Sequence, residues 1–182
     1  MKNVLFIVLL LLATSAFAQE SSIDRNGFMF GCSVGGGIHI SDNTNSPRMS
    51  IPNLKFGYML QPKFGLVLYL PGGVSQINES NVAFEAFLPS VQYFLSEKWY
   101  VLAGAGLSVT TTPFYEVDYA EGPPEFYFGP GVSIATGYEI FQLKNKFAID
   151  IQTRVLWGNI TYDNNIQQQQ AAFDLLIGFN IF

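Results

Sequence analysis

Residues 173–182 read FDLLIGFNIF, and large apolar side chains occupy every second position of this stretch. The alternating positions are Phe173, Leu175, Ile177, Phe179 and Ile181. Because successive side chains of a β-strand point to opposite faces of the sheet, this pattern predicts a strand with one wholly apolar face. The stretch therefore favours an all-β fold in which one face of the sheet meets an apolar environment.

The same alternation recurs along most of the preceding sequence. Eight strands are predicted, at residues 27–40, 52–60, 64–71, 82–95, 99–110, 126–140, 147–158 and 170–182. Some connectors are short turns, and four are long, at 41–50, 72–81, 111–125 and 158–169. Tight turns at one end and long loops at the other are typical of outer-membrane barrels, whose long loops lie outside the cell. The sequence therefore predicts an eight-stranded antiparallel up-and-down transmembrane β-barrel with four long extracellular loops.

Charged residues within most of the predicted strands lie on the face opposite to the apolar one. They are Lys55, Glu139, Asp150, Arg154 and Asp174. A charge facing lipid costs about 2–4 kcal/mol near the bilayer midplane, so this segregation predicts an apolar exterior and a polar interior. In strand 82–95 the apolar parity changes at Pro89 and Ser90, and we expect a β-bulge there. That bulge would turn both Glu85 and Gln92 inward.

Composition sets further limits on function. Charged residues make up 13% of the chain and aromatic residues 15%, and after the first residues no apolar run reaches the length of a transmembrane helix. A net charge of −5 without a basic patch argues against nucleic-acid binding. One cysteine and one histidine cannot supply a Cys/His metal site. Nothing in the sequence implies a metal or a cofactor.

The first residues have the pattern of an export signal. Lys2 precedes an apolar run at 4–12, and the residues AFA at 16–18 supply a small-x-small cleavage pattern. The expected domains are a cleaved signal peptide at 1–18, an N-terminal segment at 19–26 and a β-barrel domain at 27–182. An uncleaved membrane anchor is the alternative for the first segment.

Three features together carry a resemblance to a known family: the signal peptide, the stretch KWYVLAGAGL at 98–107 and the aromatic residue Phe182. With them the chain resembles the small outer-membrane β-barrel family, of the porin-like or OmpA-transmembrane-domain type. The resemblance covers the whole mature chain. It implies residence in the outer membrane of a Gram-negative cell and recognition by the barrel-assembly machinery through the terminal aromatic residue. A monomer in contact with outer-membrane lipid is expected.

The inward charges form the candidate site. The inside of an eight-stranded barrel is only wide enough for its own side chains, and unpaired charge buried there is expensive. The sequence therefore predicts an ion-pair network that fills the lumen, and a narrow cavity is the alternative. The members of the network are Lys55, Tyr69, Glu85, Glu139, Asp150, Arg154 and Asp174. Trp99, near a short turn, and Trp157, near a long loop, are expected at opposite membrane interfaces as an aromatic girdle, unless they are ordinary core aromatics.

Hairpin geometry predicts which of these residues face one another. Counting away from the turn at Pro62 and from the middle of the 72–81 connector sets Tyr69 opposite both Lys55 and Glu85. The same procedure for the last hairpin sets Arg154 opposite Asp174, close enough for an ion pair. Asp150 is the alternative partner of Arg154.

Three hypotheses for function follow. The first is a non-enzymatic integral barrel that acts in envelope integrity or surface interaction through its long loops. Acidic residues in those loops are either a solvated surface or bind lipopolysaccharide through divalent cations. The second is a lipid A-modifying enzyme that uses His39 and Ser41, which lie two residues apart on one strand face. The third is a soluble, secreted barrel of the lipocalin type.

Overall fold

A computed structural model describes residues 23–41, 44–77, 80–113, 115, 124–143 and 146–182. These residues form nine strands and one short 3-10 turn. The elements are β1 (Gly27–Ser41), β2 (Thr44–Gln61), β3 (Phe64–Leu70), β4 (Gly72–Ile77), β5 (Ser80–Phe94), β6 (Trp99–Thr111), β7 (Phe126–Leu143), β8 (Phe147–Thr161), η1 (Asp163–Asn165) and β9 (Gln167–Ile181). Within the described residues, no helix is long and apolar enough to cross a membrane.

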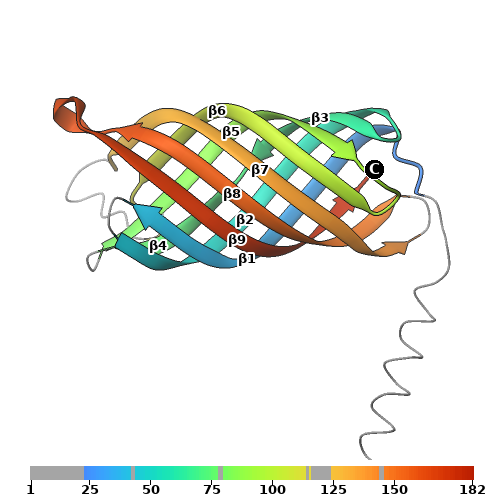
Figure 1. Ribbon diagram of the computed structural model, residues 1–182, viewed down its shortest axis with the longest axis horizontal. Coiled ribbons are helices and arrows are strands. Elements are labelled where there is room, and N and C mark those ends of the chain that lie inside the picture. The colour runs from blue at the N-terminus through green and yellow to red at the C-terminus, as the bar shows by residue number, and fades with distance from the viewer. Residues whose placement is uncertain (1–22, 42–43, 78–79, 114, 116–123, 144–145) are drawn as a thin grey trace, which may run out of the picture.

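The strands form one closed ring. Each strand pairs with its neighbours in antiparallel fashion, and β1 pairs with both β2 and β9, which closes the sheet on itself (Figure 1). Because β3 and β4 occupy one position in the wall, the nine described strands make eight positions. The predicted eight-stranded antiparallel up-and-down barrel is therefore confirmed. The signal peptide predicted at 1–18, with its cleavage site after Ala18, lies outside the described residues.

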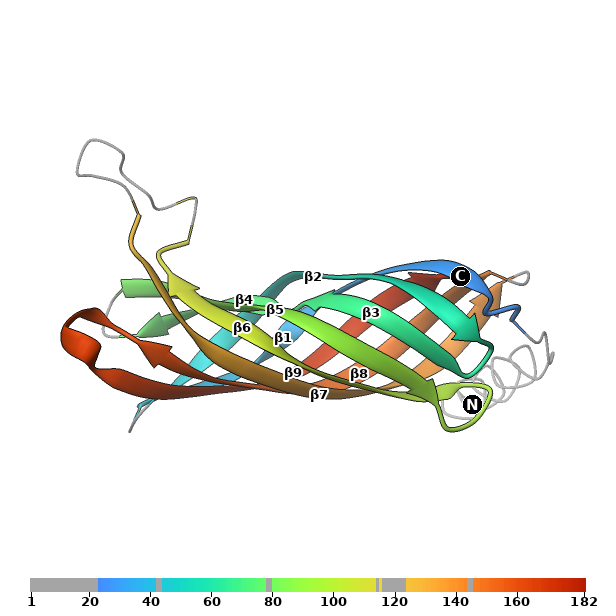
Figure 2. The ribbon, with the colours of Figure 1, turned by 90° about the horizontal axis from the view of Figure 1, so that it is seen from above.

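The two ends of the barrel differ. We call the end with the β2–β3 and β5–β6 connections the turn end, and the opposite end the rim (Figures 1 and 2). The β1–β2, β4–β5 and β8–β9 hairpins and the connector between β6 and β7 lie at the rim. Both the residue just before β1 and Phe182, just after β9, lie at the turn end, as an even-stranded barrel requires.

The prediction of four long loops is wrong. Pairing continues to Ser41 and Thr44 in the first rim hairpin and to Ile77 and Ser80 in the second. In the third it continues to the last residue of β8, before η1. Backbone N–H and C=O groups pair in a hairpin whatever the side chains are, so polar residues extend the wall beyond the apolar stretch. The long connector that agrees with the prediction runs from β6 to β7.

The expected bulge at Pro89 is also absent from the described pairing. The β5–β6 register is constant from Ala83 to Phe94, and the β3–β5 register is continuous across Pro89. Phe84 and Leu88 are fully buried inside the barrel, so the apolar residues of the upper half of β5 face the lumen. The assumption that apolar side chains mark the outer face of a strand failed here, because the lumen also accepts apolar side chains where they pack against one another. Gln92 faces inward, as expected.

A consequence of this register is that Glu85 lies on the outer face of β5. Its backbone partner in β4 is Gly72, and Tyr69 lies opposite Leu88 instead. The turn between β4 and β5 follows Ile77, later than predicted, and this delay shifts the pairing partners in β5 by an odd number of residues. Since side chains alternate with a period of two, an odd shift moves a residue to the other face of the sheet.

The wall is interrupted between β2 and its neighbours β3 and β4. Strand β4 pairs with β2 at Met49, whereas pairing with β3 begins only at Leu54. Pro71, which has no N–H to donate, separates β3 from β4. On the other side of β2, the β1–β2 register shifts between Ser33 and Gly35. We call this interruption, residues 50–53 of β2 and 71–73 opposite them, the seam.

Polar side chains from the lumen close the seam. Asn53 Oδ1 accepts a hydrogen bond from the backbone N–H of Gly72 at 2.7 Å, and Ser50 Oγ donates to the Gly72 carbonyl at 2.9 Å. Asn53 Nδ2 donates to the Ser33 carbonyl at 3.0 Å and to Ser50 Oγ at 2.7 Å. Backbone groups that the ladder leaves unpaired are thereby satisfied, as buried polar groups must be.

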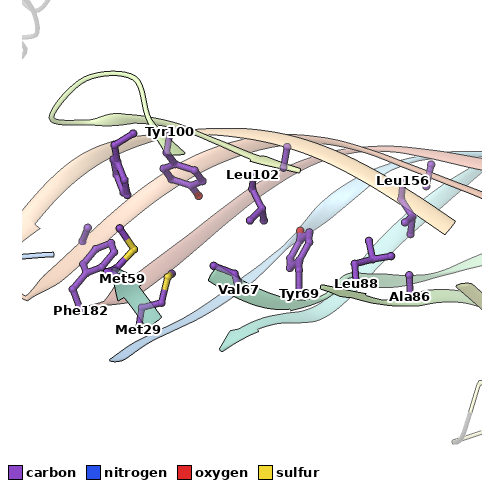
Figure 3. Close-up of a cluster of buried hydrophobic side chains, with 14 of the residues drawn as sticks. Met29, Met59, Val67, Tyr69, Ala86, Leu88, Tyr100, Leu102, Leu156 and Phe182 are labelled. Atoms are coloured by element: carbon purple, nitrogen blue, oxygen red, sulfur yellow. The ribbon is translucent and has the colours of Figure 1, made fainter. Parts of the chain in front are cut away.

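The outside of the barrel is apolar and exposed. Large side chains on the outward parity include Ile134, which is 65% exposed, and Leu175, which is 60% exposed. The inside combines polar residues with a buried apolar cluster, which Figure 3 shows as a row of side chains directed into the lumen. This cluster includes Phe182, which turns inward at the turn end. The distribution is the reverse of that in a soluble protein.

Candidate functional site

The first polar group in the lumen surrounds Asp150. Lys55 Nζ lies 3.9 Å from Asp150 Oδ2 and donates to the hydroxyl of Tyr100 at 3.2 Å. The Tyr100 hydroxyl donates to Asp150 Oδ2 at 2.5 Å. Asn180 and Gln152 each donate to the same carboxylate at 2.7 Å. Because Lys55 and Asp150 are fully buried, this pairing offsets the large desolvation penalty of both charges.

The second group surrounds Asp174 and lies beside the seam. Arg154 donates to Asp174 Oδ2 through Nη2 and also through Nε, at 3.0 Å for Nε. Arg48 Nε lies 3.3 Å from Asp174 Oδ1, so two guanidinium groups share one carboxylate. Arg154 Nη1 donates to Asn53 Oδ1 at 2.6 Å and to the Tyr69 hydroxyl at 3.1 Å. The group therefore joins β8 and β9 to the seam across the lumen.

The third group closes the turn end. Arg25 Nη2 donates to Glu139 Oε2 at 2.6 Å and to the backbone carbonyl of Glu97. The Arg25 guanidinium carbon lies 4.0 Å from the ring centroid of Phe94, within cation–π range. Arg25 is nearly buried although it precedes β1. The ring centroid of Phe182 lies 5.5 Å from the same guanidinium carbon. We call Arg25, Phe94, Glu97, Glu139 and Phe182 together the turn-end plug.

Sequence reasoning missed Arg25. Parity arguments apply only within strands, and Arg25 lies in the segment 19–26, to which no strand was assigned. The sequence nevertheless held a signal, because the predicted lumen had more acidic than basic residues. Glu139 was an inward acid without a named basic partner. A search for an unassigned cation near the barrel mouths would have pointed to this residue.

The fourth group lies in the lumen at the rim. His39 Nδ1 lies 2.5 Å from Ser75 Oγ, and His39 Nε2 lies 3.2 Å from Gln170 Oε1. The expected partner Ser41 is thus replaced by Ser75 of β4. A hydroxyl, an imidazole and a side-chain oxygen in this order have the geometry of a nucleophile, a base and an orienting group. However, His39 and Ser75 are no more than 2% exposed, and the ring of Phe84 stacks on the imidazole.

The structure brings together most, but not all, of the predicted lumen network. Lys55 is opposite Tyr69, and Arg154 is opposite Asp174, as the hairpin count predicts. The residues found in the lumen are Lys55, Tyr69, Glu139, Asp150, Arg154 and Asp174. Glu85 is the exception: it lies half-buried on the outer face, and its assignment to the lumen is wrong for the register reason given above.

The two tryptophans lie on the outer parity at opposite ends of their strands. Trp99 is the first residue of β6, at the turn end, and is 49% exposed. Its indole N–H donates to Thr136 Oγ1 at 2.6 Å. Trp157 lies in β8 toward the rim, opposite Ala171 of β9. Their placement at membrane interfaces remains a proposal.

Comparison with known proteins extends this picture. No protein-family model matches the chain, and no curated protein matches its sequence. Among solved structures, the Neisserial surface protein A (NspA) is similar, with a TM-score of 0.66 and 15% identity over 86% of this chain and 97% of that chain. The attachment invasion locus protein Ail of Yersinia pestis is similar with a TM-score of 0.51 and 13% identity, over 86% of this chain and 99% of that one. The chain therefore has the fold of the small outer-membrane β-barrel proteins.

Proposed function

We propose that the protein is an integral outer-membrane protein of a Gram-negative cell, with a closed barrel and a surface-directed rim. The observation that carries this proposal is the continuous exposure of apolar side chains around the outside of a closed sheet. An aqueous environment does not favour such a surface, whereas a bilayer does. A closed barrel also leaves no strand edge unpaired, which a membrane-spanning structure requires.

The lumen supports a barrel that does not conduct. The polar groups around Asp150 and Asp174 and the turn-end plug follow one another between the two mouths, and their principal side chains are buried. An eight-stranded barrel has room only for its own side chains. Each charged residue in these groups has a partner of opposite charge within 4.0 Å. Ions in transit would have to displace these pairs.

The rim supports a role in surface interaction. It consists of three strand hairpins and the connector between β6 and β7. The two similar structures are named as a surface protein and an attachment protein, and this agrees with such a role here. We further propose that the protein is not an enzyme, since Ser75 and His39 are enclosed among other side chains. A fluorophosphonate probe is expected to leave Ser75 unlabelled in the folded protein; labelling that Ser75→Ala abolishes would favour the enzyme.

Membrane location is tested by fractionation and by mobility in gels with and without heating. The folded barrel is expected to require detergent for extraction and to change its mobility on boiling. A protein that is released in soluble form after export would support the lipocalin alternative instead.

Orientation is tested with single cysteines in a Cys32→Ser background. Asp163→Cys at the rim is expected to react with a membrane-impermeant maleimide on intact cells, and Lys63→Cys at the turn end is expected to react only after lysis. Both positions are exposed, so a reversed labelling pattern would show that the rim faces the periplasm.

Closure is tested in planar bilayers. Wild-type protein is expected to show no steady conductance, whereas Arg25→Ala removes the cation of the turn-end plug and should give brief openings. Steady conductance of the wild type would contradict the closed barrel.

A further inference from the structure

A groove crosses the outer face of the barrel beside the seam. It consists of two adjacent cavities, of about 270 Å³ toward the rim and about 360 Å³ below it, which share Ile51 and Glu85 in their walls. The lower cavity is bounded by apolar side chains such as Leu54, Leu70 and Leu107. These residues belong to the outer parity of the wall, so the groove opens toward the surroundings of the barrel and not into the lumen.

The seam provides the space for this groove. A Cβ at Gly72 would lie 3.0 Å from Glu85 Cγ and 3.1 Å from Ile51 Cδ1, so the missing side chain keeps the two cavities connected. Toward the rim, Tyr115 of the β6–β7 connector lines the upper cavity. Ala83, on the outer parity of β5, also lines it and is only 3% exposed. The upper cavity is therefore covered on more than one side.

Glu85 is a polar residue on an otherwise apolar part of the wall. It is half-buried, and the residues that follow it on the outer parity of β5 toward the turn end are Phe87, Pro89, Val91 and Tyr93. Among the described residues, none donates a hydrogen bond to its carboxylate. Arg48 acts on it electrostatically, but the Arg48 guanidinium is buried in the lumen with Asp174. The groove thus contains a hydrogen-bond acceptor without a donor, directly above an apolar cavity.

The position of Glu85 decides which lipid can supply the donor. The groove lies near the rim, which the proposed function turns toward the cell surface, and the outer leaflet of a Gram-negative outer membrane consists of lipopolysaccharide. Acyl chains of its lipid A anchor carry a hydroxyl group on their third carbon, at the top of the apolar layer. Phospholipid chains have no hydrogen-bond donor at that depth. An acceptor at the upper boundary of an apolar groove therefore matches a chain of lipid A.

We propose that the groove binds one acyl chain of lipid A, whose chain hydroxyl donates a hydrogen bond to the Glu85 carboxylate. The rest of the chain lies in the lower cavity against Leu54 and Leu107. This inference rests on the membrane location and orientation proposed above, because only the outer leaflet holds lipid A. Divalent cations neutralise the lipid A phosphates in that leaflet, so the exposed acids near the rim, Glu125 and Asp163, do not exclude the lipid.

Selectivity comes from the hydroxyl and not from the length of the chain. Bulk lipid tails are as apolar as a leucine side chain, so moving a chain from the bilayer into the groove gains little free energy. A hydrogen bond to an ionised carboxylate is stronger than one between neutral groups. We expect a lipid whose chains lack the hydroxyl to bind roughly tenfold more weakly, as the loss of one hydrogen bond to a charged group predicts.

The test compares two synthetic monosaccharide analogues of lipid A that share the phosphate, the amide and ester links and the chain length. One carries 3-hydroxyacyl chains, and the other lacks only the chain hydroxyls. The full mature protein is refolded in detergent micelles with Mg²⁺ and equal amounts of both analogues, and native mass spectrometry measures which one stays bound. Wild type is expected to retain the hydroxylated analogue in preference to the other.

Three variants locate the origin of this preference. Glu85→Met keeps the length of the side chain but removes the strong acceptor, and it is expected to bind both analogues equally. Gly72→Ala keeps the carboxylate but fills the middle of the groove, and it is expected to lower the retention of both. Asp163→Asn removes an exposed carboxylate outside the groove and is expected to keep the wild-type preference. Heat-modifiable mobility checks the folding of each variant.

The possible failures are distinguishable. Equal retention of the two analogues by wild type, or a preference that persists in Glu85→Met, would overturn the lipid A site while the membrane location stands. Loss of the preference in Asp163→Asn would assign it to the charge of the rim, and unchanged retention by Gly72→Ala would place the lipid outside the groove. A reversed pattern in the maleimide labelling would put the groove in the phospholipid leaflet and overturn both the proposed orientation and the lipid A site.

Discussion

The wall of the barrel has a regular half, β6 to β9, and an interrupted half, β2 to β5. In the regular half β6 and β7 pair without a gap along β6, and β8 and β9 do so from Phe147 to Thr161. Between them, β7 and β8 keep one register from Phe128 to Glu139, with two residues unpaired, and shift by one residue before Phe141. In the interrupted half β2 changes partners at the seam, where Pro71 separates β3 from β4. One half is held by its backbone ladder, and the other depends locally on side chains of the lumen.

This difference shows how a membrane barrel can tolerate a break in its wall. In lipid, an unpaired backbone group has no water to bond with, so a gap in the ladder requires another partner. Asn53 and Ser50 supply that partner for Gly72. Asn53 in turn accepts from Arg154, which belongs to the regular half. The regular half thus supports the interrupted half through hydrogen bonds across the lumen.

The largest loss of stability is expected from Asp174→Ala, which removes the buried carboxylate that the regular half supplies to both Arg154 and Arg48. Arg154 and Arg48 would both remain buried without the carboxylate that they share, and breaking a buried pair in this way costs about 3–5 kcal/mol. Urea unfolding in vesicles, followed by the loss of heat-modifiable mobility, measures the free energy of unfolding. Asp163→Ala, at an exposed carboxylate, is the control and should change it by less than about 0.5 kcal/mol. Equal stability of the two variants would contradict a shared buried carboxylate.

A smaller effect is expected from Asn53→Ala at the seam. The amide N–H of Gly72 and one donor of Arg154 would lose their acceptor, and a buried polar group left unsatisfied costs about 1–3 kcal/mol. Hydrogen exchange of the Gly72 amide should also become faster, because this N–H donates to the Asn53 side chain rather than to a backbone carbonyl of a neighbouring strand. Asn45→Ala, at an exposed position of β2, should leave both measurements unchanged. Unaltered exchange at Gly72 in the Asn53 variant would show that the seam does not depend on this side chain.

The smallest effect is expected from Ser108→Ala in the regular half. Ser108 Oγ donates to the carbonyls of Gly129 and Pro130 at 3.0 and 3.1 Å. These two residues have no pairing with β8, but their ladder with β6 is continuous, so the side chain adds to existing backbone pairing. Loss of such a bond costs about 0.5–1.5 kcal/mol, and the exchange of neighbouring amides should stay slow. If Ser108→Ala destabilises the barrel more than Asn53→Ala, the contrast between the two halves is wrong.

The same contrast explains which parts of the structure the sequence could predict. Opposition of Arg154 and Asp174 followed from counting along β8 and β9, because nothing interrupts that hairpin. Opposition of Tyr69 and Glu85 failed because the turn between β4 and β5 follows Ile77, later than predicted, and shifts the β5 partners by an odd number of residues. Strand parity identifies a face only when the register is known, and it carries no information on residues outside strands, such as Arg25.

The turn-end plug has a consequence for the order of folding. Arg25 and Glu139 are 114 residues apart, and the ring of Phe182 lies against the same guanidinium. Contacts between residues so distant in sequence form late, because the entropy of closing the intervening chain must be met first. Phe182 reaches its place only when β9 has joined β1 and the sheet has become a cylinder. The environment of Arg25 therefore reports the final step of assembly, and a probe at this residue would distinguish a finished barrel from an open curved sheet.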